Sequence, residues 1–231
     1  GGGARDGGAR DGRGPRAGGG PGGRAGDYRS AGLFEKHLRD IRTLVDLIER
    51  HGGKIVAQAQ TPFTETLAAA SDPLFRELEA AGHEVALHFH EDAHLGRGCE
   101  RLPVETWTAV MKEEIERIRA CGAKKIAYWS GGNLYAGVLD AAAAAGLSVM
   151  SDYKNPRKQE SNPAVIALHP WRPAGGPTEA DLSEFARHDA EGRIVYLPGG
   201  LFTKTNYAAA RRSEETGGDR GYFDFLTECL E

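Results

Sequence analysis

Four of the eight histidines in this chain lie within the stretch GHEVALHFHEDAH, at residues 82–94. Side chains two positions apart on a strand point to the same face, which places His88 and His90 together. Side chains four apart on a helical turn also share a face, which suits His90 and His94. Zinc and similar metals favour such nitrogen ligands, completed by a carboxylate and by water. The spacing therefore predicts one divalent metal ion, zinc first, although hydrogen-bonded histidines without a metal remain the alternative. His83, at the start of the strand, faces away and is expected to be structural.

Helices and strands alternate along the part of the chain that carries these histidines. Helices are expected at 33–51, 71–82, 104–121, 134–146, 178–189 and 222–231, and strands at 54–59, 83–90, 124–130, 147–152, 164–169 and 193–198. Such alternation predicts an α/β fold with parallel strands and helix-covered faces. Six strands are too few for an eight-stranded barrel. We expect a distorted seven-stranded β/α barrel, incomplete because its terminal strands are missing, and the alternative is an open parallel α/β sheet.

Polar residues gather where the expected strands end, which is where β/α folds place their ligand sites. Asp152 closes the strand 147–152, and His169 closes the strand 164–169. Asp152 either caps the turn or positions a histidine or a general base. The pair Gly131 and Gly132 predicts either a tight turn or a close approach of the backbone to a substrate.

Composition divides the chain into a tail, 1–26, and one domain, 27–231. Half of the tail is glycine, and it carries five arginines and no large apolar residue, so we expect it to be disordered. The net charge of −4 and the pI near 6.1 give no reason to expect nucleic acid as a partner. No apolar run is long enough to span a membrane, and no signal peptide is visible. Three widely spaced cysteines favour a reducing compartment, so we expect a cytoplasmic protein.

The stretch from Leu33 to His94 resembles the polysaccharide deacetylase family, carbohydrate esterase family 4. The resemblance rests on LFRELEAAGHEVALHFHEDAH, a helix that ends in AAGHE before a strand that delivers histidines. The family's second motif has two zinc-binding histidines four residues apart. A register anchored on GHE starts at His88 and places Asp92 in the second position, whereas a shift of two residues gives His90 and His94.

The other family motifs are matched more loosely. Paired aspartates form the first motif, and only Asp27 lies near that place. WSGGN stands where the family has an arginine-containing groove motif, and SDYKNP offers Asp152 as the aspartate that tunes the catalytic residues. IALH offers His169 as the catalytic histidine of the last motif. The resemblance thus implies metal ligands among His88, His90, His94 and Asp27, and catalytic roles for Asp152 and His169.

This resemblance implies a metal-dependent hydrolase that removes an acyl group from an amide on a carbohydrate. The metal would polarise the carbonyl and activate a water, a carboxylate would take the proton, and a histidine would protonate the leaving amine. Two alternatives stay open. One is a non-catalytic carbohydrate-binding or inactive domain, in which Trp129, Tyr153 and Trp171 stack on sugars. The other is a different metal-dependent β/α-barrel enzyme, such as a sugar isomerase, with Glu91, Asp92 and Asp152 as carboxylate ligands.

Overall fold

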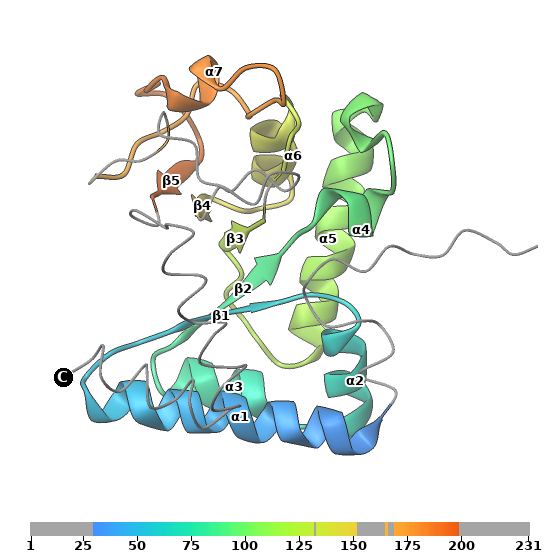
Figure 1. Ribbon diagram of the computed structural model, residues 1–231, viewed down its shortest axis with the longest axis vertical. Coiled ribbons are helices and arrows are strands. Elements are labelled where there is room, and N and C mark those ends of the chain that lie inside the picture. Colours follow the sequence, from blue (N-terminus) through green and yellow to red (C-terminus); the bar gives the residue numbers. More distant parts are fainter. Residues whose placement is uncertain (1–29, 132, 152–164, 166–168, 199–231) are drawn as a thin grey trace, which may run out of the picture.

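The computed structural model describes residues 30–131, 133–151, 165 and 169–198, and it shows an α/β fold built on a parallel sheet (Figure 1). The five strands follow in sequence order across the sheet, each hydrogen-bonded to the next. They are β1 (Val56–Ala59), β2 (Glu84–His88), β3 (Tyr128–Ser130), β4 (Val149–Ser151) and β5 (Val195–Leu197). The predicted α/β class with a parallel sheet is confirmed. Closure into a barrel is not seen among these residues, and an open parallel sheet is consistent with them.

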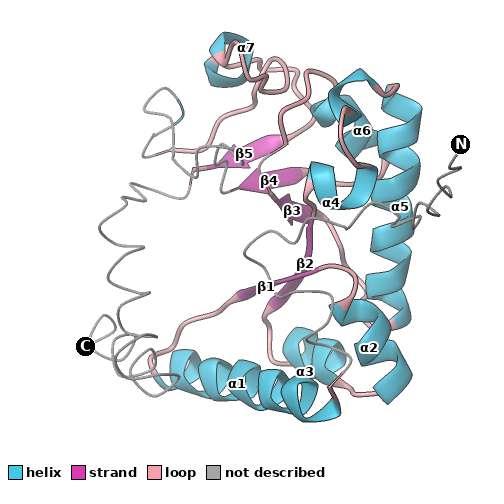
Figure 2. Ribbon diagram, turned by 45° about the vertical axis from the view of Figure 1, so that its right-hand side comes forward, coloured by secondary structure: helices cyan, strands magenta, loops and turns pink. Residues whose placement is uncertain are grey.

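Helices connect the strands, and several of them line one side of the sheet. The described helices are α1 (Ala31–Arg50), α2 (Phe63–Ala70), α3 (Leu74–Ala80), α4 (Glu91–Leu95), the 3₁₀ helix η2 (Cys99–Arg101), α5 (Val104–Ala120), α6 (Val138–Ala144) and α7 (Ser183–Ala186). Figure 2 shows α2, α5 and α6 on the same side of the strands. This arrangement follows from the strand order, because right-handed crossovers that always step in one direction leave their helices on one face. Within the described residues, none of these helices is long and apolar enough to cross a membrane.

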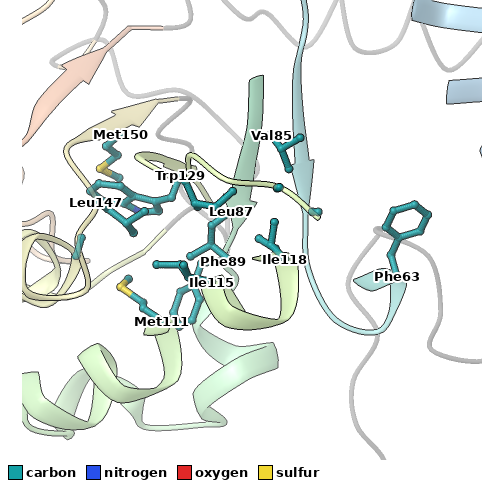
Figure 3. Packing of buried hydrophobic residues seen from close by; sticks show 14 of the residues in the cluster. Phe63, Val85, Leu87, Phe89, Met111, Ile115, Ile118, Trp129, Leu147 and Met150 are labelled. Atoms are coloured by element: carbon teal, nitrogen blue, oxygen red, sulfur yellow. The ribbon is translucent and has the colours of Figure 1, made fainter. Parts of the chain in front are cut away.

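The face of the sheet that meets the helices is apolar. Leu87 of β2 pairs with Trp129 of β3, and both are fully buried. Figure 3 shows Leu87 next to Ile115 and Ile118, which α5 presents at helical spacing. Burying side chains of this size contributes about 1.5–3 kcal/mol each to folding. The strand end that carries the histidines is therefore anchored from behind by the core.

The opposite face of the sheet is polar near the carboxyl end of β2. His88 pairs with Ser130 of β3, and Ser130 pairs with Ser151 of β4. Paired residues of parallel strands point to the same side, so these three side chains form a row across the sheet. The alternation along β2 thus sends Leu87 into the core and His88 to the polar face.

The predicted elements differ from the observed ones in several places; the strand expected at 124–130, for example, begins only at Tyr128. Helix α2 (Phe63–Ala70) was not expected, because the short segment FTETLAAA lacks a full apolar repeat and a capping residue. The helix expected at 178–189 is reduced to Ser183–Ala186, so that prediction is wrong over most of its length. Thr178 and Asp181 instead form a turn, in which the Thr178 hydroxyl accepts the Asp181 N–H at 3.0 Å. The expected tail 1–26, most of the strand 164–169 and the helix 222–231 lie outside the described residues.

Candidate metal site at the end of strand β2

His88 and His90 lie side by side at the carboxyl end of β2. His88 is the last residue of the strand, and His90 keeps extended backbone angles before α4 begins at Glu91. Their ring centroids are 4.5 Å apart, with the rings nearly perpendicular. Both residues are half-buried. The two-residue spacing therefore brings the two imidazoles together, as expected for a strand.

A hydrogen-bonded chain of side chains holds the ring of His88. Its Nδ1 lies 2.9 Å from Oγ of Ser130, and the Ser130 hydroxyl donates to Oε1 of Gln58 on β1. Burial, followed by the charges that His90 and His94 carry when protonated, lowers the pKa of His88 to about 4. The ring is therefore neutral at neutral pH, which is the state that binds metal ions.

His94 faces a different set of partners. Its ring stacks on Phe89, with centroids 4.5 Å apart and an angle of 11° between the planes. Its Nδ1 lies 3.1 Å from the backbone N of His90 and 2.7 Å from the His90 carbonyl oxygen, and its Nε2 lies 3.8 Å from Oε2 of Glu114. Because His90 is still extended, the four-residue spacing brings His94 to the His90 backbone and not to its ring. The rings of His88 and His90 thus lie next to each other, whereas the His94 ring stacks on Phe89 and lies near Glu114.

Glu114 is a buried acidic residue that the sequence interpretation did not single out. Its carboxylate accepts hydrogen bonds from the backbone N–H and the hydroxyl of Thr61, at 3.0 and 2.9 Å, and lies 3.2 Å from Arg117. Burial acts to raise the pKa of Glu114, but the nearby His94 ring and the hydrogen bonds from Thr61 outweigh it and lower the pKa overall. A signal existed in the sequence, because Glu114 lies on the apolar face of α5, between Met111 and Ile115.

Two side chains and a glycine tie the loop after β3 to the loop after β2. Asn133 donates from Nδ2 to the Phe89 carbonyl at 2.9 Å, and the carboxylate of Glu91 accepts the backbone N–H of Leu134. Gly131 has φ = 128°, and a Cβ at this position would lie 2.0 Å from the Phe89 carbonyl oxygen. The two interpretations of this glycine, a tight turn or a close approach to a substrate, both stay open, and the close contact that the structure shows is with the chain's own backbone. Gly132 lies outside the described residues.

Of the three other predicted functional residues, one lies in the described part of the chain. Asp27 and Asp152, the expected metal ligand and catalytic aspartate, lie outside the described residues. His169 is described and is exposed at the protein surface. Their roles stay predictions.

The residues invoked for the alternative functions have structural partners. Trp129 and Trp171 are buried, and their indole N–H groups donate to Asn133 and to the Phe185 carbonyl, so neither ring offers a face to a sugar. Tyr153 lies outside the described residues. The Glu91 carboxylate is buried and engaged with Leu134, and Asp92 is exposed.

The donor set can be compared with what a zinc ion requires. The two imidazoles, whose centroids are 4.5 Å apart, are near enough for one ion to reach both, since Zn–N bonds are about 2.0–2.1 Å. Across residues 30–131, 133–151, 165 and 169–198, no group of three or more His, Cys, Asp or Glu side chains is arranged to hold a metal ion. The pair His88 and His90 therefore fits part of a zinc ligand set.

Comparison of the chain with known protein families, with curated proteins and with solved structures found no match.

Proposed function

We propose that this chain is a metal-dependent hydrolase that removes an acyl group from an amide on a carbohydrate, with zinc bound at His88 and His90. The observation that carries the proposal is the pair of imidazoles, 4.5 Å apart, at the carboxyl end of a parallel strand, with the pKa of His88 lowered to about 4. Parallel α/β folds bind their ligands at this edge of the sheet. The likeness of residues 33–94 to polysaccharide deacetylases supports the same chemistry.

We also infer that the sheet belongs to a distorted seven-stranded β/α barrel. Doubly wound open sheets reverse their strand order at the ligand site. The order β1-β2-β3-β4-β5 has no such reversal, and α2, α5 and α6 lie along one side of the strands. Both features are typical of a barrel wall, and they support the barrel over the open sheet.

When bound, zinc would polarise the substrate carbonyl and lower the pKa of a bound water. His88 and His90 would hold the ion with their ring nitrogens. His94 and Glu114 fix the backbone of His90 from behind and so position its ring. In this proposal Asp152 is the aspartate that tunes the catalytic residues, and His169 is the acid that protonates the leaving amine.

The proposal is tested by titrating zinc into the metal-free chain in a calorimeter. His88→Ala and His90→Ala should each weaken zinc binding by roughly tenfold or more, since even the loss of an outer contact costs about that much. His51→Ala, at an exposed histidine, is the matched control and should bind like the wild type. Equal affinity in all four proteins would contradict the proposal.

His94→Ala separates the two arrangements of the site. A loss as large as that of His90→Ala would support direct coordination by His94, as the family register implies. A smaller loss would support the positioning role that its contacts with Glu114 and the His90 backbone indicate. Release of acetate from an N-acetylated oligosaccharide, measured with the zinc-loaded protein, then tests the hydrolysis itself.

A further inference from the structure

We propose that Gln58 and Ser130 fix the tautomer of His88, so that its Nδ1 carries the proton and its Nε2 presents a lone pair to a ligand. The inference concerns positioning residues, and its metal-binding consequence rests on the proposed function. The protonation pattern itself does not depend on a metal.

The three side chains come from three adjacent strands and share the polar face of the sheet. His88 of β2 is the direct partner of Ser130 on β3. Gln58 of β1 pairs with Ala86, which is two residues before His88 and therefore on the same face. Parallel pairing thus places the amide, the hydroxyl and the imidazole on one face of the sheet.

The direction of the hydrogen bonds follows from counting protons. A serine hydroxyl has one proton to donate, and the carbonyl oxygen of a glutamine side chain can only accept. The Ser130 hydroxyl donates to Oε1 of Gln58. Its oxygen must then act as the acceptor toward His88, whose Nδ1 lies 2.9 Å away. Nδ1 of His88 therefore carries the proton, and in the neutral ring Nε2 is left without one.

Burial makes this assignment firm. Ser130 is 1% exposed, so its hydroxyl has to find both partners within the protein. Gln58 is itself exposed, yet it supplies the acceptor that the buried hydroxyl needs. If that acceptor is removed, the hydroxyl is free to donate to Nδ1 of His88, which moves the imidazole proton to Nε2. The exposed Gln58 thereby controls which nitrogen of a half-buried ring can bind a metal.

The first measurement uses the metal-free full chain and long-range ¹H–¹⁵N NMR correlations of the histidine rings. For His88 we expect a protonated Nδ1 and an unprotonated Nε2 at neutral pH. Gln58→Glu keeps an acceptor for the Ser130 hydroxyl and should preserve this pattern. Gln58→Leu removes the acceptor and should convert His88 wholly or partly to the form protonated at Nε2.

The second measurement is zinc affinity, for which Gln58→Leu should be roughly tenfold weaker than the wild type. Gln58→Glu should bind zinc at least as tightly as the wild type, which a merely structural role of Gln58 does not predict. A wild-type His88 protonated at Nε2, or identical ring spectra for the Leu and Glu variants, would overturn the inference. A chain that binds no zinc but has the expected ring spectra would refute the proposed function and leave the tautomer assignment standing.

Discussion

Replacing His88 with asparagine should make the metal-free protein more resistant to acid. The side-chain N–H of asparagine can still donate to Ser130, while the titrating ring is lost. In the wild type the pKa of His88 is lowered from 6.5 to about 4, mainly by burial. The unfolded chain then binds this proton more readily than the folded chain, so the free energy of unfolding falls as the pH drops through 6.5 toward 4.

The size of the effect follows from that pKa difference. Each difference of one in pKa corresponds to about 1.36 kcal/mol, so the full loss is about 3 kcal/mol once the pH is below 4. At pH 5 the two pKa values give a loss of about 2 kcal/mol relative to pH 7.5. Between pH 7.5 and pH 5 the wild type should therefore lose about 2 kcal/mol more unfolding free energy than His88→Asn does.

Urea unfolding at pH 7.5, 6 and 5, in the presence of a chelator, measures this difference directly. His51→Asn is the matched control, because His51 is exposed, and its curve should stay parallel to that of the wild type. If the curves of His88→Asn and the wild type are parallel across the whole range, the burial of the His88 ring is not what the structure indicates.

The remaining predictions concern the supports of the site and the metal. Gly131→Ala should lower the free energy of unfolding by more than about 2 kcal/mol, because the added Cβ would collide with the Phe89 carbonyl. The control is Gly96→Ala, which has open space around it and should cost less. Urea unfolding measures both variants. Glu114→Ala should cost about 1–3 kcal/mol by leaving the part-buried N–H of Thr61 unpaired, whereas the exposed Glu116→Ala should cost under about 0.5 kcal/mol. Zinc at a hundred times its Kd should add about 2.7 kcal/mol to stability in thermal unfolding, an effect that His90→Ala should reduce.

The sheet and its apolar face could be predicted because each rests on a local pattern. The alternation of HEVALHFH fixes which residues of β2 face the core, and the period of α5 fixes Met111, Ile115 and Ile118 against it. The pairing of the His88 and His90 rings follows from the same alternation. These features depend on residues that are close together in the sequence, so their patterns can be recognised without a structure.

The rest of the site depends on contacts between distant residues. Whether His94 joins the other rings is decided by the extended backbone of His90 and by Glu114, which lies twenty residues further along. Ser130 and Gln58 are separated by 72 positions, and only the order of the strands makes them neighbours. The spacing of residues within one segment does not predict such contacts. The candidate ligands could therefore be predicted from the sequence, but the residues that position them could not.

The buried polar contacts explain how a site at the ends of short strands is kept in place. Glu114 ties Thr61, in the loop after β1, to His94, in the helix after β2. Asn133 and Glu91 tie the loop after β3 to the same segment. Glu114, Asn133 and Glu91 are buried, so breaking one of these contacts leaves a donor or acceptor unsatisfied, and the contacts hold the three loops against one another. A binding site needs this rigidity, because ligands held by packed and hydrogen-bonded neighbours lose little entropy when the metal or substrate arrives.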